Sequence, residues 1–279
     1  MRPSELESLI TEAPSGSERA PGLLPLAHVS SVGGFDSILA SGKLVPRHCD
    51  LLQRSCVFLS YGAVHFRPAS RQVIAQRPPP PELPIVFLFQ PSLLSSVDRC
   101  YPFDTGALLS GRFGHDETGK EWRATFTPID ERCAVLVKDG HGPWSLVQRL
   151  YESNERYLDG NAVPRGSETG VLGELLRLLR ADLRVAGIDQ RQQTIECIAS
   201  SELLLDAKLC WVGLPEGDLE ADCYELLDRI DSSTRSAEVY AYPLRPRNLD
   251  PKALTALVAE HASAAIERLF RDRVKAWER

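Results

Sequence analysis

The stretch "LAHVSSVGGFDSILASGKL", residues 26–44, decides which fold the sequence predicts. A short extended run ends near His28 and leads into hydroxyl residues and a glycine pair at 33–34. The apolar residues within 35–39 share one helical face, and Gly42 is placed to end that helix. The stretch therefore predicts a strand, a polar junction and an amphipathic helix. It is too polar at its start to be only a core strand and too regular to be only a loop.

The polar junction has the groups that bind a phosphorylated sugar. His28 offers a ring nitrogen and Ser30 a hydroxyl, and both hydrogen-bond well to sugars. The glycines allow the backbone to approach a ligand closely, and a helix beginning there points amide N–H groups at a phosphate. We therefore treat His28 and Ser30 as candidate ligand-binding residues.

Length and composition describe an ordinary globular protein. The chain has 279 residues, of which 43% are hydrophobic and 25% charged. Residues 1–22 mix Ser, Pro, Glu and Gly and are predicted to be a flexible leader with at most one helical turn. Residues 23–279 are predicted to form a single domain, and no internal repeat is found.

The charge is distributed unevenly. The formal net charge of -6 argues against a surface that grips nucleic acid all over. One segment is basic, however, since residues 43–77 carry six Lys and Arg residues against Asp50 alone. This combination predicts a confined site for an anionic ligand.

The seven cysteines form no Cys-x-x-Cys pair, and their spacing to histidines is not typical of zinc. Several lie in apolar runs, which favours buried free thiols in a reducing cytoplasm. No segment resembles a signal peptide or reaches membrane-spanning length. We expect a cytoplasmic, soluble protein without a bound metal.

The remaining patterns indicate a mixed α+β fold. A leucine stripe predicts a helix over residues 169–186, and a long helix begins at Pro251 and runs to Trp277. The Gly-, Thr- and Asp-rich middle, residues 101–131, is predicted to be an insertion or lid. Strands are predicted at 56–62, 85–90, 133–138, 193–199, 208–214 and 237–243, with 208–214 as the neighbour of 193–199.

The opening stretch resembles the first motif of the ADP-ribosyltransferase superfamily, of the His-Tyr-Glu type, and is closest to its DarT-like branch, which modifies nucleic acid. The matching positions are His28-x-Ser30, Phe35, Ile38-Leu39 and Gly42-x-Leu44. The branch has threonine where Ser30 stands and asparagine where Gly34 stands, and the second departure puts the substrate class in question.

The resemblance implies an α+β fold with a split β-sheet core, flanking helices and the long C-terminal helix. It also implies NAD as a substrate, with His28 and Ser30 holding the ribose and the amide and with Gly42 belonging to the same site. Tyr61 of "VFLSYG" would stack on the nicotinamide, and Glu196 of "QTIECIA" would bind the ribose hydroxyl beside the breaking bond. The diphosphate would meet Arg67 or Arg71.

The chemistry agrees with these roles. Departure of nicotinamide leaves an oxocarbenium-like sugar, which a fixed carboxylate stabilises. An aromatic face adds about 1 kcal/mol through stacking. We therefore expect His28, Tyr61 and Glu196 to converge on one hollow that holds the dinucleotide.

Each candidate also has a purely structural interpretation. His28 would then be a packed or surface histidine, Ser30 a turn or cap residue and Tyr61 a strand-end aromatic, while Arg67 and Arg71 would belong to a solvated face.

Alternation along 193–199 places Thr194, Glu196 and Ile198 on one side and apolar residues on the other. Glu196 therefore faces either a cleft or solvent. Glu152 and Glu155 are rival carboxylates.

Three classes of function follow. The first is an ADP-ribosyltransferase with NAD as donor and nucleic acid or protein as acceptor, acting as a toxin or defence effector, or the related NAD glycohydrolase with water as acceptor. The second is a metal-dependent nuclease with ligands among Glu168, Glu174, Asp189 and Glu196. The third is a non-catalytic module that binds a nucleotide or a partner. The apolar face of the C-terminal helix suits a homodimer or the core equally well.

Overall fold

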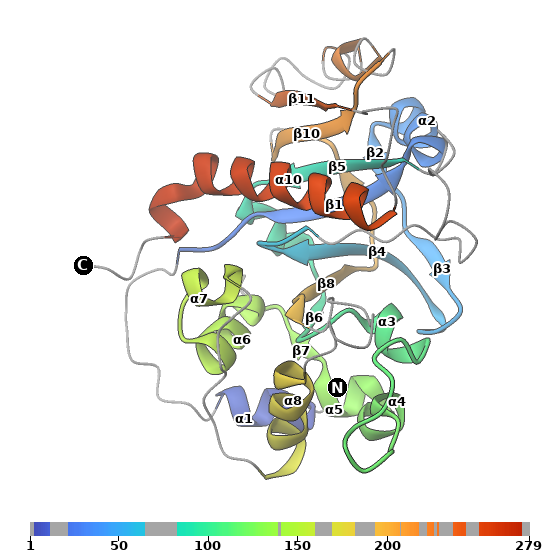
Figure 1. Ribbon diagram of the computed structural model, residues 1–279. Helices are drawn as coiled ribbons and strands as arrows, with labels where there is room; N and C mark the ends of the chain where they lie inside the picture. The colour runs from blue at the N-terminus through green and yellow to red at the C-terminus, as the bar shows by residue number, and fades with distance from the viewer. Residues whose placement is uncertain are drawn as a thin grey trace.

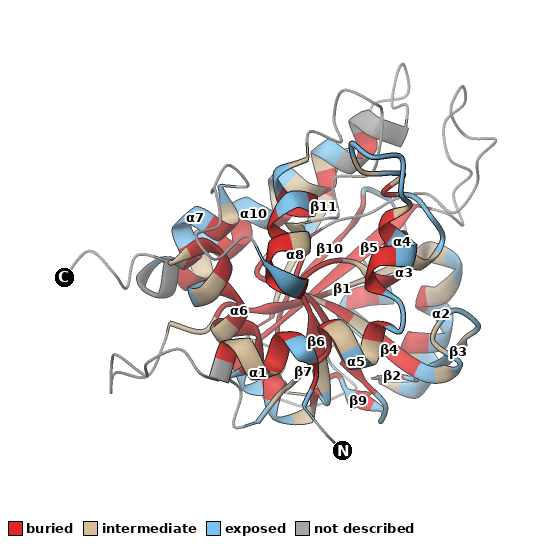
Figure 2. Cartoon of the chain, turned by 90° about the horizontal axis from the view of Figure 1, so that it is seen from below, coloured by how far each residue is buried: buried red, intermediate tan, exposed pale blue. Residues whose placement is uncertain are grey.

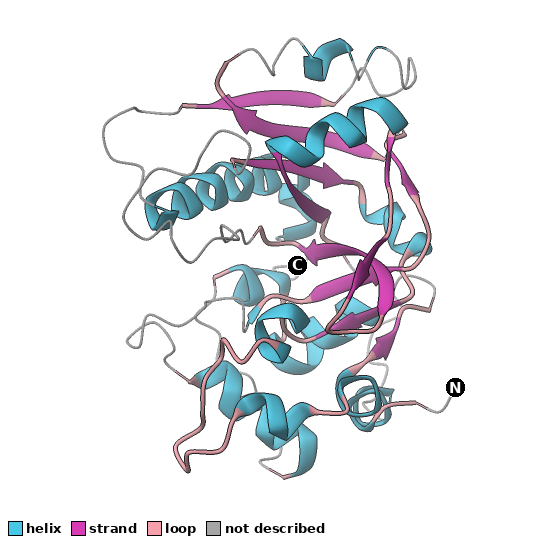
Figure 3. Cartoon of the chain, turned by 90° about the vertical axis from the view of Figure 1, so that its right-hand side faces the viewer, coloured by secondary structure: helices cyan, strands magenta, loops and turns pink. Residues whose placement is uncertain are grey.

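A computed structural model gives the structure of residues 3–11, 22–64, 83–138, 141–159, 169–181, 193–206, 208–217, 222–225, 228, 237–243 and 251–274. Within these residues the strands form a central layer with helices on both sides (Figure 1, Figure 3). Buried residues are concentrated in the strands and on the inner faces of the helices (Figure 2).

The central sheet has nine strands among the described residues and is mostly antiparallel, with β10 and β11 as the parallel pair. Its order is β11–β10–β5–β1–β4–β8–β6–β7, and β3 pairs with β4. The strands are β1 (Leu26–Ser31), β3 (Arg47–Cys49), β4 (Arg54–Tyr61), β5 (Pro84–Phe89), β6 (Arg99–Tyr101), β7 (Val135–Leu136), β8 (Glu196–Ala199), β10 (Leu209–Pro215) and β11 (Glu238–Tyr242). A second, two-stranded sheet pairs β2 (Lys43–Leu44) with β9 (Leu203–Leu204).

The sheet divides beside His28. All six residues of β1 pair with β5, but only Leu26 and Ala27 pair with β4, opposite Tyr61 and Ser60. Beyond Ala27, β1 continues with β5 and β10, whereas β4 continues with β8 and β3. The predicted α+β class with a split sheet is therefore confirmed.

The opening stretch folds as its local pattern predicts. Helix α2 (Val32–Ser41) follows β1, and the Ser31 side chain caps its start by accepting a hydrogen bond from the Gly34 amide. Phe35 and Ile38 are buried on its inner face. Gly42 ends the helix at a φ of 65°, a left-handed conformation that glycine adopts without strain, and its N–H bonds to the Ile38 carbonyl.

The long C-terminal helix α10 (Pro251–Val274) lies across one face of the sheet (Figure 1). Its apolar side chains pack on residues of β1, β5 and β10; those fully or nearly fully buried are Leu254, Val258, Ala262, Ala265, Ile266 and Phe270. The apolar face of α10, which we also considered as a homodimer contact, is therefore covered by the sheet of the same chain.

The other helices pack around the β4–β8–β6–β7 half of the sheet or against its edges. They are α1 (Glu5–Thr11), α3 (Thr105–Leu109), α4 (Trp122–Phe126), α5 (Ile129–Cys133), α6 (Gly142–Tyr151), α7 (Asn154–Leu158), α8 (Gly170–Arg180) and the 3₁₀ helix η3 (Pro91–Ser96). The leucine stripe of α8 is confirmed, since Leu172, Leu175, Leu176 and Leu179 are buried. Leu183 lies outside the described residues.

Several expectations from the sequence need correction. The predicted leader contains α1, whose Leu6 and Ile10 are buried in the core, so residues 5–11 are a packed element. The predicted lid, 101–131, is also packed: it forms β6 and α3–α5 and buries aromatic side chains. A cluster of large apolar residues outweighs the loop-like composition of this segment.

Two strand predictions also change. The run 133–138 contains the end of α5 and only the two residues of β7. The run 208–214 forms β10, but β10 pairs with β5 and β11, whereas the strand at 196–199 pairs with β4 and β6. Pairing between distant strands depends on tertiary contacts that a local pattern does not encode.

Candidate functional site

The two faces of the sheet carry different chemistry. Cross-strand partners project to the same face, and neighbours along a strand alternate between faces. Ala27, Ser60, Glu196 and Tyr101 lie opposite one another on consecutive strands and define the Glu196 face. Their neighbours define the other face, which we call the Tyr61 face.

Glu196 is a buried carboxylate on β8, two strands away from β1. Its side chain is 7% exposed, and its Oε2 accepts two hydrogen bonds from Thr105, one from the backbone N–H at 3.1 Å and one from the hydroxyl. Thr105 opens α3, and Asp104 caps that helix by accepting from the Ala107 amide at 2.6 Å. The predicted alternation is confirmed for Glu196–Ala199, because the strand begins only at Glu196. Glu196 itself faces the 101–109 segment and is shielded from bulk solvent.

His28 lies where the sheet divides. Its Nδ1 is 2.9 Å from the carbonyl oxygen of Phe58 on β4, so the ring bridges the gap that β1 leaves as it departs from β4. A carbonyl oxygen only accepts hydrogen bonds, so Nδ1 carries the proton and the neutral ring keeps Nε2 as an acceptor. Burial lowers the pKa of His28 below 6.5, the bond to Phe58 opposes this, and the positive charge of Arg47 lowers it further. The neutral form is therefore favoured at pH 7.

Ser30 and Gly34 fit closely against each other. The Ser30 hydroxyl donates to the Ser31 carbonyl at 3.3 Å and is partly exposed. A Cβ atom at position 34 would come within 2.6 Å of the Ser30 Oγ, so a larger residue there would require that hydroxyl to move. Gly42 ends α2, and its carbonyl accepts from the Leu205 amide, so the structure gives it a scaffold role. Its contact with NAD stays a prediction.

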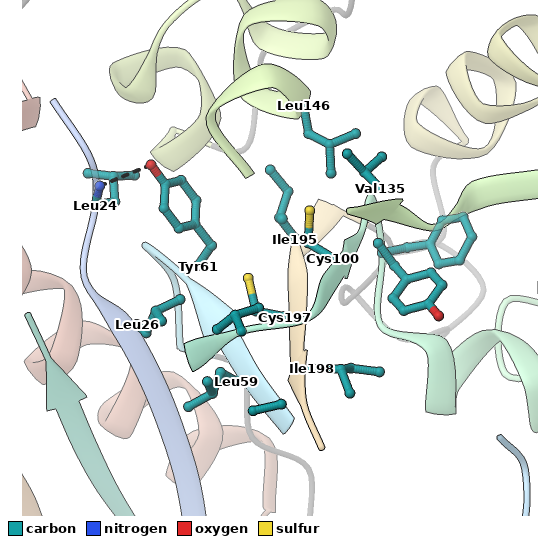
Figure 4. Close-up of a cluster of buried hydrophobic side chains, with 14 of the residues drawn as sticks. Leu24, Leu26, Leu59, Tyr61, Cys100, Val135, Leu146, Ile195, Cys197 and Ile198 are labelled. Carbon is teal, nitrogen blue, oxygen red and sulfur yellow. Dashed lines mark hydrogen bonds between the residues drawn. The ribbon is translucent and has the colours of Figure 1, made fainter. Parts of the chain in front are cut away.

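Tyr61 does not share a face with Glu196. The register pairs Ser60 with Glu196, which directs Tyr61 to the opposite face. Its ring is 0% exposed, and its hydroxyl accepts from the Leu24 amide at 3.0 Å (Figure 4). The ring also packs near Tyr157, at 6.3 Å between centroids. Tyr61 is a core residue; by register it shares a face with His28 and not with Glu196, so the structure does not show the predicted convergence of His28, Tyr61 and Glu196.

The predicted arginines Arg67 and Arg71 lie outside the described residues. Arg47 on β3, which we did not single out, is exposed, and its charge acts on His28. Its place in the basic segment 43–77 was a signal for a phosphate contact, but the sequence alone did not separate it from the other basic residues.

A polar cluster that the sequence did not predict adjoins Glu196. Asp130 on α5 accepts hydrogen bonds from Arg54 at 2.8 Å, from Arg99 at 2.9 Å and from the Tyr101 hydroxyl. Burial alone would raise the pKa of Asp130, but the bonds from Tyr101 and Arg54 hold it below 3.8. Tyr101 is the cross-strand partner of Glu196, so the cluster fixes the strand beside it. Asp130 and Arg54 are 76 positions apart, and no sequence signal links them.

The rival carboxylates lie elsewhere. Glu152 pairs with Arg156 at the junction of α6 and α7, and Glu155 is exposed on α7. Of the suggested metal ligands, Glu174 is bonded to Arg177, while Glu168 and Asp189 lie outside the described residues. Within the described part of the chain, no three Asp, Glu, His or Cys residues are placed to hold a metal ion. No helix in that part is long and apolar enough to cross a membrane.

The neutral imidazole of His28 and the held carboxylate of Glu196 lie on nearby strands but leave the sheet on opposite faces, because His28 follows Ala27 and pairs with Phe87, whereas Glu196 pairs with Ser60. Ala27 precedes His28 and lies two strand spacings from Glu196, about 10 Å. Along β4, Phe58 and Ser60 on the Glu196 face are partly exposed, whereas Leu59 and Tyr61 are buried. Residues 28–31 of β1 are partly exposed as well. The partly exposed residues therefore lie on β1 from His28 onward and, on β4, on the face of Glu196.

Comparisons with known proteins give one structural likeness to report. No family model matches the chain, and no curated protein matches it. Among solved structures, DarT from Thermus sp. 2.9 in complex with NAD+ matches with a TM-score of 0.39 and 10% sequence identity. The match covers 79% of this chain and 96% of that one. The functional proposal below rests on the residues of this chain.

Proposed function

We propose that the chain is an ADP-ribosyltransferase that moves ADP-ribose from NAD to a nucleic acid or a protein. The observation that carries the proposal is the Glu196 carboxylate, buried on β8 and held by Thr105, beside the divided sheet that presents His28. The motif from His28 to Leu44, which resembles that of the ADP-ribosyltransferases, supports the same activity independently of this geometry.

The reaction requires that the bond between nicotinamide and the ribose C1′ breaks. Nicotinamide leaves with the electron pair of that bond, and the sugar develops positive charge as in glycoside cleavage. Glu196 stabilises this charge electrostatically and accepts a hydrogen bond from a ribose hydroxyl. An oxygen or nitrogen atom of the acceptor then bonds to C1′ and releases its proton.

The other residues bind and orient NAD in this proposal. The Nε2 of His28 accepts a hydrogen bond from a ribose hydroxyl, because Nδ1 is committed to the Phe58 carbonyl. The Ser30 hydroxyl, on the same stretch of β1, also hydrogen-bonds to NAD in this proposal. The diphosphate meets arginine, for which Arg47, Arg67 and Arg71 are the candidates. Tyr61 has no role in binding nicotinamide.

The fate of a label tests the activity and its class. The chain is incubated with NAD labelled in its adenylate phosphate, together with DNA, RNA and protein acceptors. We expect label on an acceptor, and a loss of about 100- to 1000-fold for Glu196→Gln. Glu7→Gln is the matched control, because Glu7 on α1 is also 7% exposed. This variant should retain activity.

Other outcomes separate the alternatives. Nicotinamide release without a labelled acceptor identifies an NAD glycohydrolase, and NAD binding without turnover identifies a non-catalytic module. A nuclease activity that needs a divalent metal and no NAD would overturn the proposal.

A toxin or defence role in the cytoplasm is a further part of the proposal. Expression of the active chain should then inhibit growth, whereas equal amounts of Glu196→Gln should not. Equal growth of the two strains would contradict the toxin or defence role.

A further inference from the structure

Thr105 makes an unusual contact with Glu196, because one residue supplies two donors to one oxygen. Both its backbone N–H and its hydroxyl reach Oε2 of the carboxylate. Thr105 is 0% exposed, so bulk water does not reach its side chain to replace the hydroxyl. The 91 positions between the two residues make this a tertiary contact.

The geometry fixes the carboxylate as a whole. A carboxylate is planar, so holding Oε2 at two points also places Oε1. Hydrogen bonds donated to a carboxylate favour its charged form, and charge-assisted bonds are stronger than those between neutral groups. Buried carboxylates otherwise tend to take up a proton, because burial disfavours the charge.

We infer that Thr105 is a positioning residue that keeps Glu196 ionised and oriented for NAD cleavage. This inference rests on the proposed function, since Glu196 is the group through which Thr105 acts. Asp104 contributes by capping the first turn of α3, which holds the Thr105 amide in place. The segment 101–109 is therefore part of the catalytic apparatus, although its residues need not touch the substrate.

The test compares three substitutions. Thr105→Val removes the hydroxyl and keeps the shape and the backbone N–H. Thr105→Ser restores the hydroxyl. Thr125→Val is the matched control on the neighbouring helix α4, because Thr125 is 1% exposed and its hydroxyl has no partner among the described residues.

Two readouts are measured for each variant. One is the pH profile of nicotinamide release, and the other is the pKa of the Glu196 carboxyl by ¹³C NMR, assigned with Glu196→Gln. For Thr105→Val we expect the carboxyl pKa to rise by about one unit, the acid limb of the profile to move up equally, and the rate to fall about 100-fold. Thr105→Ser and Thr125→Val should resemble the wild type in both readouts.

The outcomes separate this inference from the proposed function. A wild-type pKa and pH profile in Thr105→Val overturns the inference and leaves the function standing. An equal shift in Thr125→Val also overturns it, because the effect would then be one of packing. If the wild-type chain cleaves no NAD, the proposed function fails, and the NMR titration alone decides whether Thr105 holds Glu196 in its charged form.

Discussion

Replacement of Tyr61 separates a packing role from a role in stacking on nicotinamide. Tyr61→Phe keeps the ring but removes the hydroxyl that accepts from the Leu24 amide. Because Leu24 and Tyr61 are both 0% exposed, the amide is left without its partner in a dry environment. Such a loss costs about 2 kcal/mol of the free energy of unfolding, which lowers the melting temperature by about 5 °C.

Tyr61→Leu extends the test by removing the ring as well. The ring packs near Tyr157, so its loss adds a cavity, and we expect a total cost of about 4 kcal/mol. Chemical denaturation measures this free energy for both variants. KM for NAD, measured at 10 °C on the fraction that remains folded, should stay within about twofold of wild type.

The opposite pattern would refute this assignment. If Tyr61→Leu unfolds like the wild type but raises KM for NAD more than about tenfold, the ring contacts nicotinamide and not the core. Tyr157→Phe is a useful companion, because the Tyr157 hydroxyl also bonds within this region, to the Tyr61 carbonyl. Tyr157→Phe should lower the free energy of unfolding and leave KM for NAD unchanged.

Three further predictions concern charge. Asp130→Asn weakens the bonds that hold Arg54 and Arg99 and should lower the free energy of unfolding by about 1 kcal/mol, as measured in urea, because Asp130 is partly exposed to solvent. An unchanged free energy of unfolding would contradict the cluster's role. Because the pKa of His28 lies below 6.5, its neutral ring costs no stability above that pH, and both stability and NAD turnover should decline as the pH falls from 6.5 through the lowered pKa. Arg47→Ala should raise that pKa and move the acid limb of the turnover profile to higher pH, while an unmoved limb would show that the charge of Arg47 does not reach the ring.

The elements that the sequence predicted well are those set by local chemistry. The helix at 32–41 is bounded by the Ser31 cap and by Gly42, and both residues directly flank the helix in the sequence. The strand at 84–89 is apolar throughout because both its faces are covered, so a continuous run was sufficient. The long C-terminal helix was likewise visible in its repeating apolar positions.

The segment 101–131 shows where composition misleads. Glycine, threonine and aspartate suggested a loose insertion, yet Phe103, Phe113, Trp122 and Phe126 are almost wholly buried. Trp122 and Phe126 lie one turn apart on α4, but Phe103 and Phe113 lie in turns, so no single helical or strand period spans the four residues. Their burial depends on contacts with distant elements.

Strand register explains which predictions about the candidate site agree with the structure. Alternation along the strand places Glu196 opposite its apolar neighbours, and the structure has it on that face; its catalytic role stays a prediction. Tyr61 was misassigned because Ser60, and not Tyr61, lies opposite Glu196, and a shift of one residue reverses the face of a strand. Thr105 and Asp130 reach the site from segments that the sequence does not connect with it.

A crystal structure of the Glu196→Gln chain with NAD would test the central claim most directly, since this variant should bind NAD without cleaving it. The account predicts intact NAD with its nicotinamide ribose beside residue 196. The Nε2 of His28 should lie within hydrogen-bonding distance of a ribose hydroxyl. NAD bound away from both residues would contradict the account.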